Sequence, residues 1–563
     1  MHVPPRYSYT RAVDLDVDDR RRVPVVIVGA GLIGLALALD LARRQVPSVV
    51  LEARDAPIEG SRAIVFAKRS LEILARLGLG PRLRQKGVSW KVGRLFHQDC
   101  EAFAFDFQPE PGHAWPAFIN LQQSYVEEWL AQACSATGLV ELRSRNRVTG
   151  VDQHADGATV DVDTPDGAYR LECDWLVACD GARSTVRRAL DLPFVGAAFP
   201  DRFLIVDIEM IDSTFPAERR FWFDPPFHPN RSVLLHKQPD NLWRVDFQLG
   251  TDADPELERQ PERVEKRLRA MFGDDLPFRI DWLSIYTFRC RRLERFVHSR
   301  IVFAGDSAHE VSPFGGRGGN GGLQDVDNLG WRIAAMLRHG APASLIDSYG
   351  EERVFAADEN ILNSTRSARF ISPDSPSVSV LRDAALALAR TTPFGRTLVN
   401  SGRLSRPSVL TGVGQFSDAA ALAGALKPGS PAFDAPVMRG DACGWLLDDL
   451  GGNGYTLLIY DMPARAAAMA LDSAAFIHPL RVVTVAPERP PRDAHAPHGV
   501  VLWDHEGKVA SRYGLTPGNA VLLRPDQHVL GVFEGADSDA LRRCLGNTLG
   551  VSASTTFEEA QSW

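Results

Sequence analysis

The chain has 563 residues, which is too long for one hydrophobic core and predicts two or three domains. Its hydrophobic content of 45% is that of a water-soluble globular protein, and its net charge of -8 gives no reason to expect nucleic acid as a partner. The seven cysteines are scattered and contain no C-x-x-C pair, which argues against a disulfide framework or a zinc site and fits a reducing cytoplasm.

The first 22 residues are polar and charged without an apolar period, and we expect a loosely ordered tail. The run from Arg20 to Arg22 precedes an uncharged stretch ending at Leu39, a pattern also found in twin-arginine export signals and membrane anchors. This stretch is short for a membrane span and contains glycines at nucleotide-binding spacing. We therefore expect no membrane partner.

Residues 23–52 have the pattern of a dinucleotide-binding βαβ unit. We expect a buried strand over 23–28, a helix to about Arg44 and a second strand over 48–51 that ends at Glu52. The first strand is followed by the G-x-G-x-x-G motif, whose glycines allow a tight turn, close approach of a pyrophosphate and helix–strand packing. The acid can accept a hydrogen bond from a ribose hydroxyl. The alternative is a tight turn without a ligand, and the motif alone does not choose between FAD and NAD.

The segment from 61 to 190 predicts further elements around this unit. Its first part ends in an amphipathic helix, and Arg62 in front of that helix either contacts a flavin or phosphate or is an ordinary exposed arginine. Residues 120–130 are expected to open another helix. Asp-Gly turns separate three short expected strands of an antiparallel meander, 147–151, 159–162 and 169–173. A further strand from Trp175 leads into Asp180-Gly181 and a short helix.

The pattern changes between 191 and 290, where we expect a mostly antiparallel sheet. Its expected strands are 203–210, 220–223, 232–236, 242–249 and 278–288, with a helix over 261–272. Within 242–249 apolar and polar residues alternate, so one face should pack and the other should meet solvent or a ligand. The face toward the nucleotide domain is the natural place for a small-molecule pocket.

A glycine-dense segment follows a short apolar run over 301–304. After Gly305-Asp306 it contains six glycines between 315 and 322, and a helix is expected from about Gln324 to His339. Glycine is costly in ordered structure unless the backbone needs unusual dihedrals or close approach. The segment therefore predicts a backbone pressed against a flat or anionic ligand at a helix N-terminus, and the alternative is a flexible surface loop.

Long helices are expected to about residue 400, followed by a Gly/Pro/Ser-rich break over 427–436. Beyond it the sequence predicts a small α/β domain with a helix over 538–549. Its expected strands are 455–461, 480–485, 500–503 and 520–524.

Three motifs occur in a fixed order, each after an expected strand: Gly29-x-Gly31-x-x-Gly34, Cys179-Asp-Gly181 and Gly305-Asp306. This set resembles the single-component (group A) FAD-dependent aromatic hydroxylases of the para-hydroxybenzoate hydroxylase fold. Residues 175–188 and the loop after Gly305 resemble most the 3-(3-hydroxyphenyl)propionate hydroxylases and the phenol and polyketide hydroxylases. The likeness covers about residues 23–363. The C-terminal part looks like the thioredoxin-like domain that some members carry without redox cysteines.

The resemblance implies an α/β protein with a Rossmann-like FAD-binding domain, an inserted, mostly antiparallel substrate-binding sheet and a C-terminal thioredoxin-like α/β domain. Together with the sequence patterns above, the resemblance predicts the domain boundaries. The expected parts are the tail 1–22, the FAD-binding domain in two parts, 23–190 and 291–424, the substrate sheet domain 191–290, and the thioredoxin-like domain 425–563.

The resemblance also implies FAD contacts at specific positions. Those implied for the pyrophosphate and adenosine are Gly29, Ala30, Gly31, Ile33, Gly34, Glu52, Ala53 and Arg54. Those implied for the flavin side are Arg62, Gln123 (with Gln122 as the adjacent alternative), Asp306 at the ribityl chain, Pro313 over the ring, and the backbone of Gly318, Gly319 and Asn320. Asp180 and Arg183 would lie between the cofactor domain and a groove for a nicotinamide cofactor.

The implied reaction begins when NADPH or NADH reduces bound FAD. Reduced flavin then reacts with dioxygen to give a C4a-hydroperoxide, which transfers one oxygen to a phenolic ring. A base near the substrate hydroxyl would help, and His236 and Tyr286 on expected sheet strands are the catalytic candidates, with an ordinary sheet role as the alternative for each. His309 is expected to hold the loop. A homodimer is usual in the family.

The sequence patterns alone are also compatible with two other functions. The first is an FAD-dependent reductase or dehydrogenase without oxygen insertion, and the second is a non-enzymatic flavin-binding module. A disulfide oxidoreductase would need a second G-x-G-x-x-G and a reactive cysteine pair, and the sequence contains neither. Ser307 and His309 have no acid at the spacing of a nucleophile triad, which argues against a hydrolase.

Overall fold

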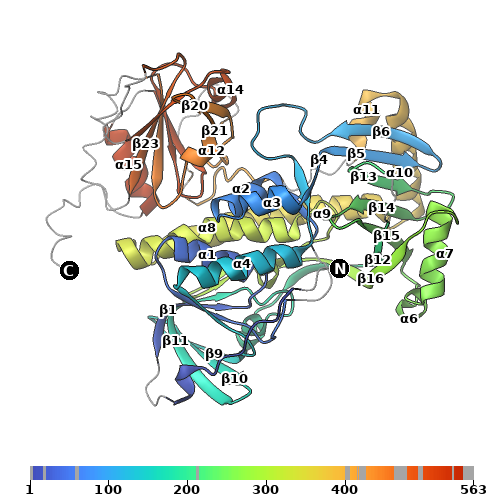
Figure 1. Ribbon diagram of the computed structural model, residues 1–563, viewed down its shortest axis with the longest axis horizontal. Helices are drawn as coiled ribbons and strands as arrows, with labels where there is room; N and C mark the ends of the chain where they lie inside the picture. Colours follow the sequence, from blue (N-terminus) through green and yellow to red (C-terminus); the bar gives the residue numbers. More distant parts are fainter. Residues whose placement is uncertain are drawn as a thin grey trace.

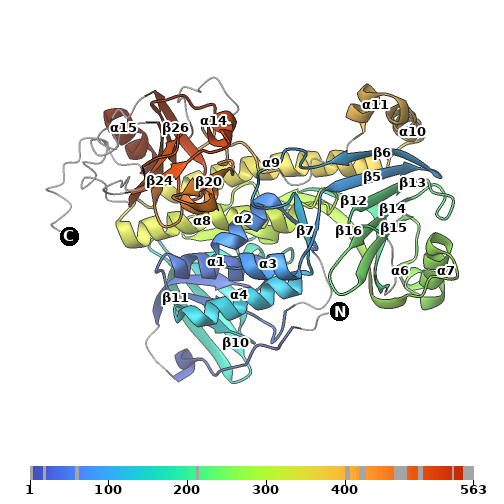
Figure 2. The same ribbon diagram turned by 45° about the horizontal axis from the view of Figure 1, so that its top comes forward.

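The computed structural model describes residues 4–16, 21–57, 63–210, 215–399, 406–414, 416, 426–461, 479–491, 499–534 and 538–549. Three large sheets are arranged around two long helices, α8 (Gly318–His339) and α9 (Leu345–Ile371), which cross the middle of the molecule (Figure 1). The turned view separates the C-terminal sheet at one end of these helices from the sheet that carries α6 and α7 at the other (Figure 2). Within the described ranges, no helix combines the length and apolar character needed to cross a membrane.

The first sheet has the order β17-β18-β11-β1-β2-β8, and β10 and β9 extend it from β11. Its core strands pair in parallel, and Val25, Val26 and Ile27 of β1 are fully buried, as expected for a strand covered on both faces. Its strands are β1 (Arg22–Val28), β2 (Ser48–Leu51), β8 (Val140–Arg143), β9 (Arg147–Gln153), β10 (Ala158–Thr164), β11 (Gly167–Ala178), β17 (Val297–His298) and β18 (Ile301–Phe303). The expected strands on either side of residue 174 are thus one strand, which pairs antiparallel with β10 and parallel with β1.

Helices and short strands complete this domain around the first sheet. The expected helix to about Arg44 is α1 (Leu32–Arg43), and the helix expected within 120–130 begins three residues later than Asn120, as α4 (Gln123–Thr137). The other elements here are η1 (Val13–Asp16), β3 (Val65–Ala67), α2 (Lys68–Arg76), α3 (Gly80–Lys86), β4 (Val88–Trp90), β7 (Phe118–Asn120), α5 (Thr185–Ala189) and η2 (Gly305–Ser307). Strands β3, β7 and β4 form a small sheet of their own.

The second sheet has the order β19-β16-β12-β15-β14-β13-β5-β6 and is antiparallel except where β13 meets β5. Its elements are β5 (Val92–His97), β6 (Cys100–Asp106), β12 (Val195–Glu209), β13 (Arg219–Phe223), β14 (Ser232–Lys237), β15 (Leu242–Gly250), α6 (Pro255–Glu258), α7 (Pro261–Phe272), β16 (Arg279–Arg292) and β19 (His309–Glu310). The mostly antiparallel sheet and the bounds of α7 agree with the sequence patterns. The hairpin β5–β6 was not predicted, because its place in the sheet depends on pairing with a strand far along the chain.

The expectation of an open polar face on β15 is only partly right. The apolar residues of β15 pack against α7, as the alternation predicts. Arg244 and Gln248 on the other face are also buried, so this face meets protein over much of its length rather than solvent. Arg244 donates two hydrogen bonds of 2.8 Å to the carboxylate of Asp207 on β12. Pairing therefore makes a charged residue acceptable in the interior.

The third sheet, at the C-terminal end, has the order β21-β20-β24-β23-β22-β25-β26. Strands β22, β23 and β24 are parallel and the outer pairs are antiparallel. The elements after α9 are α10 (Pro376–Thr391), α11 (Pro393–Leu398), β20 (Pro436–Arg439), β21 (Ala442–Trp445), α12 (Leu446–Asp449), β22 (Tyr455–Tyr460), β23 (Leu480–Ala486), β24 (Gly499–Trp503), α14 (Lys508–Tyr513), β25 (Asn519–Leu523), β26 (Val529–Glu534) and α15 (Ser538–Leu549).

Two expectations about local order are wrong. Residues 4–16 are not a loose tail: Ala12 and Asp14 are buried, and the Asp14 carboxylate lies 2.7 Å from Arg143 of β8. Helix α8 begins at Gly318, six residues before the expected start. Its glycines allow close packing, since a Cβ on Gly322 would lie 2.6 Å from the side chain of Ile33 on α1. Low helix propensity is thus overridden by tertiary packing.

Candidate functional site

In the turn between β1 and α1, the packing of the protein itself excludes a side chain at two of the three glycines but not at the third. Gly29 has φ +103°, and a Cβ there would lie 2.6 Å from the carbonyl oxygen of Cys179. A Cβ on Gly34 would lie 1.9 Å from the carbonyl oxygen of Gly29. A Cβ on Gly31, by contrast, would meet only Glu127 among the described residues, at 3.7 Å. The space in front of Gly31, at the N-terminus of α1, is therefore open to an anionic ligand.

Two buried carboxylates flank this turn. Glu52, after β2, accepts hydrogen bonds from the backbone N–H of Ala30 at 2.9 Å and of Arg54 at 3.0 Å, with Ala53 between them in the chain. Glu127 on α4 accepts from the backbone N–H of Leu32 at 3.0 Å, and burial raises the pKa of its carboxyl. Both acids use the positive end of α1 and keep the turn fixed.

Asp180 at the end of β11 caps the short helix α5. Its Oδ2 accepts hydrogen bonds from the backbone N–H of Thr185 at 2.6 Å and of Val186 at 3.2 Å. Its Oδ1 is buried without a hydrogen-bond partner among the residues that the structure describes, and burial raises the pKa of this carboxyl. One oxygen thus holds the local fold and the other is left for a further donor.

The turn after β18 presents Asp306 at its surface. Gly305 has φ +65°, and a Cβ there would lie 2.9 Å from Ile33, which sits behind the G-x-G-x-x-G turn. Gly305 and Ser307 are buried, whereas Asp306 is only half-buried. The close approach of the two turns places Asp306 beside the first helix of the nucleotide unit.

His309 connects this segment to α8. Its Nε2 lies 2.7 Å from Oδ2 of Asp325, and the same carboxylate accepts a hydrogen bond of 2.7 Å from Arg353 on α9. The contacts with His309 and Arg353 hold the pKa of Asp325 below its usual value despite burial. These contacts are those of a residue that fixes the loop, in line with the expected holding role of His309.

The first turn of α8 leaves its backbone N–H groups available. The side chain of Asn320 is committed, because its Oδ1 accepts from the N–H of Ala67 at 2.9 Å and its Nδ2 donates to the carbonyl of Val65 at 2.8 Å. The first N–H groups of a helix have no acceptor within it, so Gly318, Gly319 and Asn320 present donors at the positive end of α8. Pro313 lies five residues before this turn.

The two glutamines before and at the start of α4 differ in their contacts. Gln123 accepts a hydrogen bond of 3.2 Å from the N–H of Ala63 and donates one of 2.7 Å to Glu127. Both terminal atoms of Gln122 are buried without a partner in the described part of the chain. Arg62, next to Ala63, lies outside the described residues.

The two catalytic candidates are not brought together. His236 on β14 is 6% exposed, and burial together with Arg219 and Arg244 lowers the pKa of its imidazole well below the usual value. Tyr286 on β16 is 46% exposed and lies beside Phe288. Three strand spacings, roughly 14 Å, separate β14 from β16. One proton relay therefore cannot include both side chains directly.

Arg219, which the sequence analysis missed, lies on the same face of the second sheet as His236. The pairing of Arg220 with Leu235 places Arg219 opposite His236. The period of two in Arg219-Arg-Phe-Trp-Phe223 is the signal that could have found it, because one of two adjacent arginines must share the buried face of the phenylalanines.

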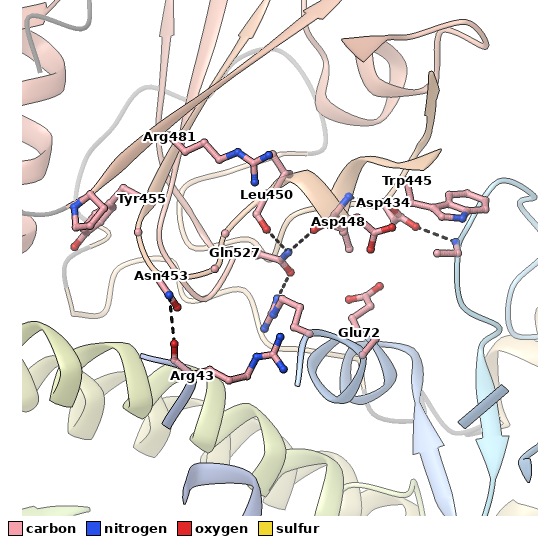
Figure 3. A pocket seen from close by; sticks show the side chains of 18 of the residues that line it. Arg43, Glu72, Asp434, Trp445, Asp448, Leu450, Asn453, Tyr455, Arg481 and Gln527 are labelled. Atoms are coloured by element: carbon pink, nitrogen blue, oxygen red, sulfur yellow. Dashed lines mark hydrogen bonds between the residues drawn. The ribbon is translucent and has the colours of Figure 1, made fainter. Parts of the chain in front are cut away.

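A cleft of about 730 Å³ lies away from the glycine turns, between α2 and the third sheet. Figure 3 shows polar groups of the cleft in contact: Asn453 reaches the carbonyl of Arg43 at the end of α1, and the amide of Gln527 points toward Leu450 within the C-terminal part. Gln527 also accepts a hydrogen bond from Arg76 of α2. The cleft is thus a seam between two parts of the chain and is remote from the glycine turns.

The chain matches known proteins over nearly its whole length. The model of the FAD binding domain matches residues 22–364, and that of the HcaD C-terminal domain matches residues 433–548. The chain is 28% identical over 525 residues, 90% of each chain, to a 3-(3-hydroxy-phenyl)propionate/3-hydroxycinnamic acid hydroxylase of Mycolicibacterium smegmatis. It is 32% identical over 395 residues, 67% of this chain and 75% of the relative, to a 12-dehydrotetracycline 5-monooxygenase/anhydrotetracycline 6-monooxygenase of Streptomyces rimosus.

The fold is also similar to a solved structure. The crystal structure of aklavinone-11 hydroxylase in a ternary complex with FAD and aklavinone matches with a TM-score of 0.75. The match covers 95% of this chain and 100% of that chain at 24% identity. At this identity the likeness shows that the two chains share a fold.

Proposed function

The chain belongs to the FAD binding domain family, and from this premise we propose how it hydroxylates an aromatic ring. The protein is an FAD-dependent monooxygenase of aromatic substrates that uses a reduced nicotinamide cofactor. The observation that carries this function is the convergence of the turns at Gly29, Cys179 and Gly305 near the start of α1, in a chain that matches an aromatic hydroxylase over 90% of its length. The similar hydroxylases favour this function over an FAD reductase without oxygen insertion.

We propose that the glycine turns and two helix N-termini hold FAD. The open face of Gly31 and the positive end of α1 suit the pyrophosphate, with Ala30, Ile33 and Gly34 shaping the turn. Glu52 suits the adenosine ribose, supported by its fixed position between Ala30 and Arg54. Positions proposed for the rest of the cofactor are Ala53, Arg54, Arg62, Gln123, Asp180, Asp306, Pro313, Gly318, Gly319 and Asn320.

When bound, FAD supplies the electron transfer from the nicotinamide cofactor and the activation of dioxygen. The residues of this chain then have three tasks. The N–H groups at the start of α8 stabilise negative charge on the reduced ring. Aromatic side chains of the second sheet and the loop, Phe203, Phe288 and Phe314, pack against one another and exclude water. The face around His236 orients the substrate.

We propose His236 rather than Tyr286 as the residue that exchanges a proton with the substrate hydroxyl. Its Nδ1 is buried without a partner in the described residues, and the lowered pKa keeps the imidazole neutral, so that this nitrogen can accept a hydrogen bond from the substrate hydroxyl. Tyr286 is at the exposed edge of the sheet, so its side chain is less shielded from water. The comparison of turnover in His236→Gln and Tyr286→Phe across pH tests this choice.

The division of the chain and its assembly are also proposals. We propose a thioredoxin-like C-terminal domain over 425–563, supported by the central parallel strands β22 to β24. The remaining boundaries are those given above for 23–190, 191–290 and 291–424. We further propose a cytoplasmic homodimer, supported by the seven free cysteines and by exposed apolar side chains on α10 and α11.

One experiment tests the function and another tests the cofactor site. The purified holoenzyme should consume NADH or NADPH faster when a phenol is added and should place labelled oxygen from dioxygen in the product. Consumption that no phenol stimulates would contradict the assignment. Asp306→Ala should yield protein without flavin absorbance, because the proposed contact with the ribityl chain is lost, and retention of full absorbance would refute that contact.

A further inference from the structure

A row of charged side chains crosses the face of the second sheet that looks toward the glycine loop. Strand pairing places Arg219 of β13 opposite His236 of β14, His236 opposite Arg244 of β15, and Arg244 opposite Asp207 of β12. Asp246 lies on the same face, two residues after Arg244. The row is thus fixed by backbone hydrogen bonds and presents its side chains in a rigid order.

Only part of this row is paired. Arg244 and Asp207 form a bidentate ion pair, with both contacts at 2.8 Å. Arg219 takes part in none of the hydrogen bonds or ion pairs between residues that the structure describes, and its Nε is buried. Burial lowers the pKa of Arg219 to about 10, and burial raises the pKa of Asp246 to about 6. Arg219 is half-buried as a whole, but its Nε is buried without a direct partner, which is costly unless a ligand supplies one.

The surroundings of Arg219 are aromatic. A narrow cavity of about 30 Å³ is lined by Arg219, Phe105, Phe221, Phe314, Gly315 and Phe370. This volume is enough for a small polar head group or a water molecule but not for a whole ring. Phe314 and Gly315 follow Pro313, in the loop that leads into α8. The cavity therefore opens beside the loop proposed to lie against the flavin.

Neighbouring arginines show that the lack of a partner is specific to this position. Arg220, the next residue, points to the other face and lies 2.8 Å from Glu218. Arg94, which also lines the cavity, pairs with Glu218 at 3.0 Å and with Glu101 at 2.8 Å. The chain thus supplies carboxylates to the arginines on either side and none in direct contact to Arg219.

We propose that Arg219 is the subsite for the carboxylate of an aromatic acid, so that the substrate is a phenol with an anionic side chain rather than a neutral phenol. This inference rests on the proposed hydroxylase function and adds the substrate class. A guanidinium offers a planar pair of donors that matches a carboxylate, and the phenylalanines accommodate the adjoining hydrocarbon. The ring would then extend from the cavity toward the loop and His236.

The test measures binding to the oxidised holoenzyme by the change in the flavin absorption spectrum, which needs no turnover. The probes are 3-(3-hydroxyphenyl)propionate and the neutral alcohol 3-(3-hydroxyphenyl)propan-1-ol. We expect the acid to bind at least tenfold more tightly than the alcohol. Arg219→Met should weaken binding of the acid by about 30-fold or more, since truncating one partner of a buried charged pair costs at least this much affinity. Binding of the alcohol should weaken by less than about threefold.

Two further variants control the result. Arg220→Met, on the other face of the same strand, should leave both dissociation constants unchanged. Arg219→Lys keeps the charge without the fork of donors and should bind the acid with intermediate affinity, which also covers the case in which Arg219→Met fails to fold. Equal losses for acid and alcohol, or a wild-type enzyme that binds the acid no better than the alcohol, would overturn the proposal. Failure of the hydroxylase function would instead appear as the absence of labelled product, whatever the binding data show.

Discussion

Two clusters of charged side chains in this protein differ in whether their members are paired. The first joins α8 and α9 to the third sheet and contains Arg332, Glu352, Arg524 and Asp526, all fully buried. Glu352 accepts hydrogen bonds of 2.7 Å from both Arg332 and Arg524, and Arg524 lies 2.6 Å from Asp526. The second is the row of Arg219, His236 and Asp246, where atoms of each side chain are buried without a partner in the described residues.

The difference separates a cluster that closes the structure from one that is left open. In the first, each charge faces an opposite charge, so the cluster resists any change that removes a single member. In the second, the protein carries the cost of unsatisfied groups next to the loop that leads into α8. Buried polar groups without partners are rare in folded proteins, and each calls for an explanation, such as a bound water, an ion or a ligand. Whether a cluster of charges stabilises the fold or leaves room for a ligand therefore depends on whether its groups have partners, and not on burial alone.

The strongest test of the closed cluster is Glu352→Gln. It leaves two buried guanidinium groups with only Asp526 as an anion, and we expect it to lower the free energy of unfolding by about 3–5 kcal/mol. The adjacent exposed residue provides the control Glu351→Gln, which should change stability by less than about 0.5 kcal/mol. Urea unfolding followed by tryptophan fluorescence compares the two variants. Equal midpoints would show that the cluster contributes little.

Helix α8 connects the two regions, because it begins at the glycine loop and carries Arg332 of the closed cluster. Gly322→Ala should cost about 1–3 kcal/mol, since its Cβ would lie 2.6 Å from Ile33 and 3.2 Å from Gly305. It should also weaken FAD retention. Gly444→Ala is the control, because a Cβ there would meet nothing within 4 Å. Flavin content after gel filtration, together with the thermal midpoint, reports both effects, and wild-type values for Gly322→Ala would refute the tight packing.

The open cluster should make acid binding depend on pH. Burial raises the pKa of Asp246 to about 6, so its carboxyl is neutral below this pH and anionic above it. The groups that face it are Arg244, Asp207 and Arg219. An anionic Asp246 repels the substrate carboxylate, so affinity for the acid should fall by up to about tenfold from pH 5 to pH 7.

Asp246→Asn should remove this pH dependence without altering binding of the neutral alcohol. Spectral titrations at several pH values measure both dissociation constants. The same slope in wild type and Asp246→Asn would assign the dependence to another group.

The smallest expected effect has the opposite sign to that of Glu352→Gln. Arg219→Met removes a desolvated cation without a direct partner, so stability should stay within about 1 kcal/mol of the wild type or rise. The urea midpoint of the substrate-free enzyme measures this. A loss of more than about 2 kcal/mol would show that Arg219 is a structural member of the row, and the contrast between the two clusters would disappear.

The sequence predicted the local elements of the site well. The order of strand, G-x-G-x-x-G turn, helix and acid over 23–52 is confirmed in β1, α1 and β2, and the bounds of α7 agree at both ends. FAD and the aromatic hydroxylase function, which the family resemblance implies, agree with the similar proteins. The roles of the individual cofactor residues stay predictions, and those of His236 and Tyr286 do as well.

Sequence patterns alone determined the nucleotide-binding unit, because its signals are local: the glycine motif lies directly between a strand and a helix, and each strand shows its burial in its own hydrophobicity. The tertiary structure decided that β5 and β6 join β13, that α8 starts within the glycines, and that Arg219 rather than Arg220 faces the interior. The physical reason is that strand pairing, burial and charge satisfaction depend on residues distant in the chain. A sequence shows which charges exist, and the fold decides which of them remain unpaired.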